Sequence, residues 1–297
     1  MRLVHLTDPH LSSLQSESFS KLRGKRWSGY LSWKKNRRKR YLPSVLNSLT
    51  EAVKAEAADQ ILLTGDLIQI GLETEIAQAT QWLTELGPAE KVMLVPGNHD
   101  IYARGSADMV YQAWSEYLFQ GDPSGSAGNV ARFPVERRLG KLSLIGVSTA
   151  CVTPVFMASG RLGNKQLNEL SEMLDQASDE GQLVCLLIHH PPLPGMTHWR
   201  KALSDAAALK TILERHPPAL TFHGHLHHNR QYQWDESHIY CTAAASSAAD
   251  ASYRVIDIED KGDFWGVRMM LKSIDIEPAD KPGFVTIDDQ FWQISKK

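Results

Sequence analysis

Two features are scarce in this chain of 297 residues: cysteine and long apolar runs. The three cysteines, Cys151, Cys185 and Cys241, are scattered, which excludes a disulfide framework and a cysteine-rich metal site. No apolar run approaches the roughly 18 to 20 residues that a transmembrane helix needs. The first residues also lack the apolar stretch of a secretory signal. We therefore expect a cytoplasmic protein.

Acidic residues are missing from one segment, although the chain as a whole is nearly neutral. It has 32 basic and 34 acidic residues, a net charge of −2. Between Lys21 and Tyr41, however, there are ten basic residues and no acidic one. The remainder holds 22 basic residues against 34 acidic ones, a net charge of −12. The near-neutral total therefore hides an acidic body that carries one basic segment.

Composition and periodicity predict a single α/β domain over residues 1–297. The chain is 42% apolar and 22% charged, as soluble globular proteins are, and no repeat or Gly/Ser linker marks a boundary. Short strand-like runs alternate with helical patterns up to about residue 222. From Ile239 the helical period disappears, and strands are predicted at 239–242, 253–258 and 264–271. We expect a β-rich C-terminal part and two packed sheets.

Clusters of polar residues follow five of the predicted strands. In open α/β sheets the loops beyond the carboxyl ends of the strands line one crevice, so these clusters are expected to converge. They are Asp8-Pro9-His10, Gly65-Asp66, Gly97-Asn98-His99-Asp100, His189-His190-Pro191-Pro192 and Gly224-His225-Leu226-His227.

The side chains in these clusters predict a binuclear metal centre. Carboxylates, imidazoles and an amide, without a thiolate, suit Mn²⁺, Fe or Zn²⁺. If the backbone is extended, the spacing in Asp8-Pro9-His10 and His225-Leu226-His227 places both polar side chains of each cluster on one face. Asp66 could bridge two ions about 3.5–4 Å apart, which would clamp a phosphoryl group and acidify a water molecule.

The order of the five clusters resembles that of the calcineurin-like metallophosphoesterases. Every block of the family pattern is present, from Asp8 to His227. The resemblance implies a four-layer αββα sandwich of two mixed β-sheets flanked by helices. Within the superfamily, the first block and the run 189–192 are similar to those of bacterial cyclic-nucleotide and glycerophosphodiester phosphodiesterases.

The resemblance also implies which residues bind metal. Seven side chains are expected to share two divalent ions, which are Mn, Fe or Zn. One ion would be held by Asp8, His10 and His227 and the other by Asn98, His189 and His225, with Asp66 as the bridge.

Four residues are expected to act beside the metals or on the substrate. By resemblance, His99 contacts the substrate phosphate or protonates the leaving group, and Asp100 orients His99. Asn98 is a further candidate for substrate binding, and Arg200 could pair with a phosphate. His190 follows a predicted ligand and is interpreted as a hydrogen-bond donor that supports a ligand, or as a structural imidazole, in preference to a third metal contact.

The predicted reaction is hydrolysis of a phosphoester by in-line attack of a metal-bound hydroxide. We favour a phosphodiesterase over a monoesterase. The alternatives are a phosphatase or pyrophosphatase acting on a lipid or nucleotide headgroup, and a non-catalytic scaffold of the same fold. The scaffold is disfavoured because the sequence has every expected ligand and His99.

The basic segment 21–41 also contains Trp27, Tyr30, Trp33 and Tyr41. It follows the first cluster and resembles an insertion at the rim of the site. A substrate cap or membrane dock is the first interpretation, because interfacial segments combine tryptophan and tyrosine with basic residues. A plain surface helix or loop is the second, and nucleic-acid binding the third. We expect an anionic phosphoester substrate and peripheral contact with an anionic membrane; the sequence predicts no oligomeric state.

Overall fold

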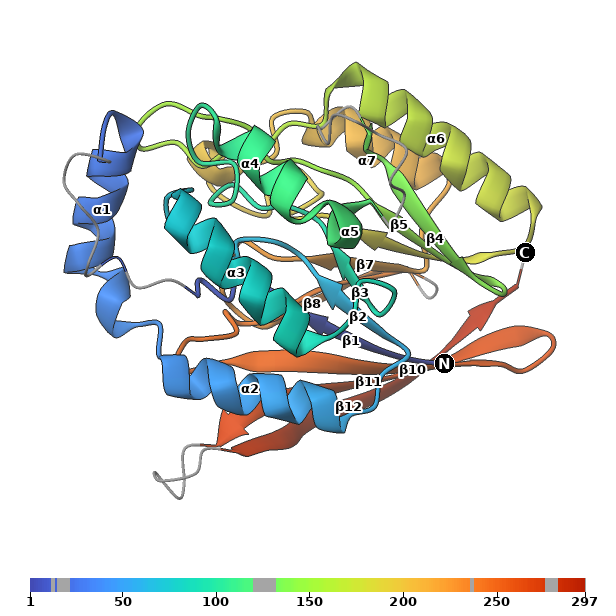
Figure 1. The fold of residues 1–297 in the computed structure, drawn as a ribbon. Coiled ribbons are helices and arrows are strands. Elements are labelled where there is room, and N and C mark those ends of the chain that lie inside the picture. The colour runs from blue at the N-terminus through green and yellow to red at the C-terminus, as the bar shows by residue number, and fades with distance from the viewer. Residues whose placement is uncertain (12–13, 15–21, 120–131, 236–237, 276–282, 297) are drawn as a thin grey trace.

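Two six-stranded sheets are stacked between layers of helices (Figure 1). The structure is a computed structural model that describes residues 1–11, 14, 22–119, 132–235, 238–275 and 283–296. The strand orders are β12-β11-β10-β1-β2-β3 and β4-β5-β6-β7-β9-β8. Each sheet is mixed, and the predicted four-layer fold is therefore confirmed.

The first sheet contains both ends of the described chain. β1 pairs in parallel with β2 and antiparallel with β10, so the C-terminal hairpins extend a parallel unit. The helices α2 and α3 lie along one face of this sheet (Figure 1). The elements are β1 (Arg2–Leu6), β2 (Gln60–Leu63), β3 (Val92–Leu94), β10 (Ser252–Asp260), β11 (Phe264–Asp275), β12 (Gly283–Ser295), α2 (Pro43–Ala55) and α3 (Glu73–Leu86).

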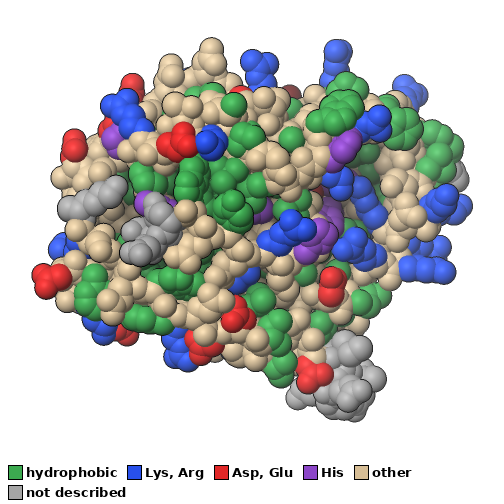
Figure 2. Space-filling model, turned by 180° about the vertical axis from the view of Figure 1, so that it is seen from behind, with side chains coloured by type: hydrophobic (Ala, Val, Ile, Leu, Met, Phe, Trp, Pro, Cys, Tyr) green, Lys and Arg blue, Asp and Glu red, His purple; other side chains and the backbone are tan. Residues whose placement is uncertain are grey.

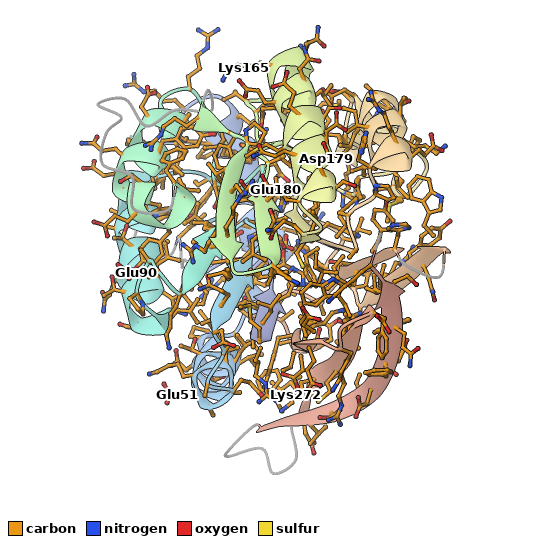
Figure 3. The ribbon with its side chains drawn as sticks, turned by 90° about the vertical axis from the view of Figure 1, so that its right-hand side faces the viewer. Glu51, Glu90, Lys165, Asp179, Glu180 and Lys272 are labelled. Atoms are coloured by element: carbon orange, nitrogen blue, oxygen red, sulfur yellow. The ribbon has the colours of Figure 1, made fainter. Side chains whose placement is uncertain are left out.

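The second sheet has a parallel centre and antiparallel edges. Its central strands are buried on both faces: Leu144 and Leu187 belong to the core between the sheets, whereas Ile145 and Leu186 pack under helices. Figure 3 shows α6, labelled at Lys165 and Asp179, on the outside of this layer. The elements are β4 (Val135–Leu139), β5 (Leu142–Gly146), β6 (Leu183–Leu187), β7 (Leu220–His223), β8 (Arg230–Asp235), β9 (His238–Thr242), α6 (Gly163–Asp179) and α7 (Ala206–Arg215).

The basic segment forms a helix, α1 (Lys25–Lys35), and a short 3-10 turn, η2 (Arg37–Lys39). Lys21 lies outside the described residues. Tyr30 and Trp33 are buried in a small separate cluster with Ile70 and Tyr102, while Trp27 is exposed. The segment is therefore anchored on one side and open on the other.

Two further helices, α4 (Ser106–Ala113) and α5 (Ser115–Leu118), follow the loop after β3, and a short turn, η4 (Trp199–Lys201), lies before α7. None of the helices in the described part of the chain combines the length and apolar character that crossing a bilayer demands.

Candidate metal centre

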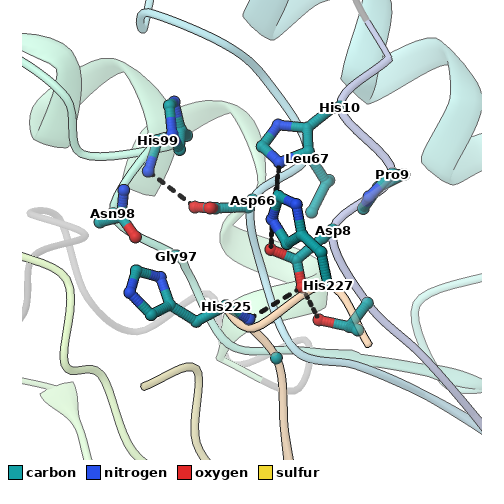
Figure 4. Close-up of polar contacts among 12 residues, drawn as sticks. Asp8, Pro9, His10, Asp66, Leu67, Gly97, Asn98, His99, His225 and His227 are labelled. Carbon is teal, nitrogen blue, oxygen red and sulfur yellow. Dashed lines mark hydrogen bonds and ion pairs between the residues drawn. The ribbon is translucent and has the colours of Figure 1, made fainter. Parts of the chain in front are cut away.

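The five predicted clusters meet beyond the carboxyl ends of β1, β2, β3, β6 and β7. Figure 4 shows the clusters that contain Asp8, Asp66, Asn98 and His225. Two groups of side chains have ligand atoms within 4.8 Å of one another. The structure brings all seven predicted ligands together, because Asn98 lies beside the second group. The first group is Asp8, His10, Asp66 and His227, and the second is His189, His190 and His225.

In the first group, two imidazoles direct the same ring atom at one carboxylate. His227 Nε2 lies 3.0 Å from Asp8 Oδ1 and 3.4 Å from His10 Nε2. The other ring nitrogens are held from outside: His10 Nδ1 by the carbonyl of Ile68 at 3.2 Å, and His227 Nδ1 by the hydroxyl of Tyr41 at 3.2 Å. Histidines that bind metal are oriented in this way through their second nitrogen.

The second group includes an imidazole nitrogen that lacks a partner. His189 Nδ1 donates to the carbonyl of Thr64 at 2.6 Å, which leaves Nε2 3.2 Å from Asn98 Oδ1 and 3.4 Å from Asp66 Oδ2. His225 Nε2 is buried without a hydrogen-bond partner among the described residues. Leaving a buried polar atom unpaired costs free energy, and a bound cation would offset that cost. The donor set and this unpaired atom both fit a metal ion.

His190 lies in the second group but has no free ring nitrogen. Its Nδ1 is 2.7 Å from Thr149 Oγ1, and its Nε2 is 3.1 Å from the carbonyl of Ala158. A neutral imidazole satisfies both contacts by accepting at Nδ1 and donating at Nε2. These contacts support a structural role for His190.

The backbone at the ligands is left-handed, not extended. This corrects the expectation that extended segments at 8–10 and 225–227 place their side chains on one face. Left-handed angles are costly for residues other than glycine, and they concentrate at functional sites where surrounding contacts enforce them. The φ angles are 52° at Asp8, 45° at His10, 58° at Asp66, 70° at His225 and 56° at His227.

Asp100 forms hydrogen bonds to the backbone of a loop. Its Oδ2 accepts hydrogen bonds from the backbone N–H groups of Asp66 and Gly97, both at 2.8 Å. His99 Nδ1 bonds to the carbonyl of Gln69 at 2.5 Å. In the described part of the chain no hydrogen bond joins Asp100 to the His99 ring, so the expected orientation of His99 by Asp100 stays a prediction. What Asp100 does here is fix the turn that carries Asp66.

The two buried carboxylates draw positive charge into the site. Burial opposes the charge of Asp8, but nearby His227 outweighs it and lowers the pKa of Asp8 to about 2. Burial likewise disfavours the charged form of His189, yet the neighbouring carboxylate of Asp66 raises the pKa of His189 to about 9. A divalent cation would supply the same compensating charge.

The sequence of residues 1–229 matches the family model described as calcineurin-like phosphoesterase. The chain belongs to this family. A curated relative from Vesicomyosocius okutanii subsp. Calyptogena okutanii (strain HA), a probable cyclic nucleotide phosphodiesterase, is 26% identical over 178 residues. That match covers 59% of this chain and 65% of the relative, so the chain spans slightly less than two thirds of its length.

Solved structures with the same fold include two phosphatases. A dimetal phosphatase from Danio rerio superposes with a TM-score of 0.65 and 14% identity, covering 99% of each chain. Purple acid phosphatase from yellow lupin (Lupinus luteus) seeds has a TM-score of 0.61 at 14% identity, covering 99% of this chain and 53% of its own. These similarities support the calcineurin-like fold.

Two residues of the basic segment reach this phosphoesterase site, and sequence reasoning did not single them out. Tyr41 holds His227, as described above, and Arg37 Nη1 lies 3.3 Å from His99 Nδ1. Burial and the Arg37 charge lower the pKa of His99 to about 3. The signal available was the basic segment itself, and these two contacts bring its C-terminal end to the candidate site.

Arg200, by contrast, has no described contact with a residue of the two ligand groups. It is exposed on η4, and its guanidinium carbon lies 5.2 Å from the centre of the Trp199 ring. Its role in phosphate binding stays a prediction.

Gly97 allows the turn after β3 to approach Asp66. A Cβ at this position would collide with Asp66 Oδ1 and the Asp66 backbone. We expect Gly97→Ala to lower metal content and to destabilise the fold by about 1–3 kcal/mol, as overpacking does. Thermal unfolding and metal analysis would measure both effects. Gly283→Ala, where a Cβ meets nothing within 4 Å, is the matched control and should change neither.

Proposed function

We propose that this protein is a phosphodiesterase that uses two divalent metal ions. The observation that carries the proposal is the pair of adjoining ligand groups, in which Asp8 and Asp66 lie among imidazole nitrogens directed inward. Oxygen and nitrogen donors of this kind accept Mn²⁺, Fe or Zn²⁺. When bound, such ions withdraw charge from a phosphoryl group and lower the pKa of water.

The chain supplies an anion-binding edge beside these groups. His99 Nδ1 already donates to Gln69, so it has no lone pair to offer Arg37, 3.3 Å away. Arg37 Nη1 donates a long hydrogen bond to Gln69 Oε1, at 3.5 Å. A guanidinium group has five N–H donors, so Arg37 keeps donor capacity for the oxygens of a phosphoryl group.

His99 is placed to move a proton at its remaining nitrogen. With Nδ1 bonded to Gln69, proton exchange is left to Nε2. The approach of an anionic substrate favours the protonated imidazole. His99 can then donate that proton to the departing alkoxide.

A small cavity next to the first ligand group indicates the kind of substrate. It measures about 100 Å³ and combines guanidinium groups with aromatic and aliphatic walls. Such a lining suits a phosphoester that carries an organic group, in contrast to inorganic phosphate. It is lined by His10, Leu11, Trp33, Arg37, Arg38, Tyr41, Leu42, Pro43, Leu46 and Ser247.

A substrate screen of the Mn²⁺-loaded protein tests the proposal. The panel would include a chromogenic diester, the corresponding monoester, cyclic nucleotides, glycerophosphodiesters and nucleotide pyrophosphates. We expect kcat/KM to be highest for a diester. A preference for the monoester or pyrophosphate would replace the proposed reaction, and a folded, metal-loaded but inactive protein would favour the scaffold.

Arg37→Ala is expected to raise KM for an anionic diester by about 10- to 100-fold, since hydrogen bonds to charged groups are worth roughly 1.5–3 kcal/mol. Steady-state kinetics would measure this change. Lys39→Ala removes the same charge from an exposed position on the same turn and should leave KM near that of the wild type. If both substitutions raise KM equally, Arg37 contributes only general electrostatic attraction and makes no specific contact with the substrate.

A further inference from the structure

We propose that the exposed side of α1, together with the neighbouring loop 152–156 and η4, docks on an anionic lipid bilayer. We call these three segments the rim surface. The evidence for docking comes from the rim surface alone. Only the benefit of docking depends on the proposed function, because a docked enzyme would meet phosphoesters carried by the membrane.

Exposed apolar side chains concentrate on the rim surface. Phe156 is 83% exposed and Trp199 63%, while Trp27 and Leu31 on α1 are 44% and 47% exposed. Of the eleven large hydrophobic residues that are exposed in the described part of the chain, six belong to these segments. The six are Trp27, Leu31, Val152, Val155, Phe156 and Trp199.

Hydrogen bonds connect the three segments into one surface. The Lys25 ammonium group, at the start of α1, donates to Thr153 Oγ1 at 2.6 Å and to the carbonyl of Met157 at 3.3 Å. The backbone N–H of Ala158 then donates to the carbonyl of Arg200 on η4 at 2.9 Å. The apolar side chains are therefore carried by segments that are fixed to one another.

The helix α1 has two apolar sides, and the fold uses only one. Tyr30 and Trp33 are buried against the small core, and Arg26 Nη2 donates to the carbonyl of Gly71 at 2.7 Å. Trp27 stacks on Tyr30 with ring centroids 6.4 Å apart, but Trp27 and Leu31, four residues apart, share an exposed flank of the helix. A large part of each of these two side chains therefore remains open to solvent.

Positive charge accompanies the exposed apolar residues. Figure 2 shows Lys and Arg side chains gathered around the histidines on the side of the molecule where α1 lies. Bilayers that contain acidic lipids attract such a surface, and tryptophan beside lysine is typical of interfacial segments. Of the nine basic residues of the segment that the structure describes, six are exposed: Arg23, Lys34, Lys35, Arg38, Lys39 and Arg40.

The aliphatic members of the rim surface favour a membrane over nucleic acid. Proteins that bind single-stranded nucleic acid stack its bases on aromatic side chains, and their basic residues follow its phosphates. Leu31, Val152 and Val155 have no aromatic face and would gain little from that mode. In the headgroup region of a bilayer, however, they are buried together with Trp27 and Phe156.

Flotation with phosphatidylcholine vesicles, with and without phosphatidylglycerol, tests the docking. We expect the wild type to bind only the anionic vesicles, more weakly at high salt. Lys34→Ala/Lys35→Ala should weaken partitioning by roughly 20- to 30-fold, since each basic residue near the surface contributes about fivefold. Trp27→Ser/Leu31→Ser should weaken it by about tenfold, with the salt dependence retained.

Two exposed double variants serve as matched controls. Lys91→Ala/Lys165→Ala removes the same charge, and Ile287→Ser/Phe291→Ser removes comparable apolar surface from β12. Both should bind as the wild type does. Absence of binding to anionic vesicles, or equal losses in the controls, would overturn the proposal. Competition by a single-stranded oligonucleotide, with vesicle binding unaffected by Trp27→Ser/Leu31→Ser, would overturn it in favour of nucleic acid.

The same variants separate docking from catalysis. Trp27→Ser/Leu31→Ser should hydrolyse a small chromogenic diester at the wild-type rate, which also shows that the protein is folded. An inactive wild type that still floats with anionic vesicles would refute the proposed function and leave the docking intact.

Discussion

Asp66→Asn is expected to lower kcat/KM by about a thousandfold or more and to reduce the metal content of the purified protein. Asparagine keeps the acceptor that Asp66 Oδ1 offers to the backbone N–H of His99 at 2.7 Å. It removes the negative charge that lies between the two ligand groups. The loss therefore reports on charge at the site, with little contribution from altered packing.

Kinetics and metal analysis of the same preparation would establish this result. Asp289→Asn removes an exposed carboxylate on β12 that pairs with Arg268 on β11. This control should change neither kcat/KM nor the metal content. Full metal content and wild-type turnover in Asp66→Asn would contradict the assignment of Asp66 as a metal ligand.

The central strands of both sheets could be predicted because each is a short apolar run buried on both faces. β2 and β6 are such apolar runs, and both form strands as predicted. β8 and β12 were missed because they are edge strands with polar or alternating sequences. A strand of this kind is recognised only through the partner with which it pairs, and the partner is a tertiary property.

The ligand set could be predicted because its chemistry is local, whereas the way the site is held together is not. The tripeptide Asp8-Pro9-His10 alone predicts metal-binding groups. The left-handed backbone at Asp8 and His10, however, could not be predicted from the sequence. Arg37 reaches His99, 62 positions away, and Tyr41 reaches His227, 186 positions away. Contacts over such separations depend on how α1 and η2 fold back onto the site.

The uneven charge of the chain acquires a spatial meaning from these contacts. Asp8 and Asp66 bring buried negative charge to the ligand groups, and Arg37 brings positive charge to their edge. The acidic and basic parts of the chain therefore adjoin at the candidate metal centre, as the proposed binding of cations and an anionic phosphoester requires.

His99→Gln is expected to reduce turnover by about 10²- to 10⁴-fold, the usual contribution of general acid–base catalysis, while metal content stays unchanged. His99 is buried, its ring stacks on Tyr102 with centroids 5.4 Å apart, and Nδ1 is held by Gln69. These contacts fix the ring and leave Nε2 as the atom at which a proton can be exchanged.

The dependence on the leaving group distinguishes the two roles predicted for His99. If the imidazole protonates the departing alkoxide, His99→Gln should impair an alkyl diester far more than a nitrophenyl diester, because nitrophenolate departs without a proton. If His99 only contacts the phosphate, both substrates should lose activity equally. His198→Gln, at an exposed histidine on the loop before η4, should leave both rates unchanged. Loss of metal from His99→Gln would contradict both roles and place His99 among the ligands.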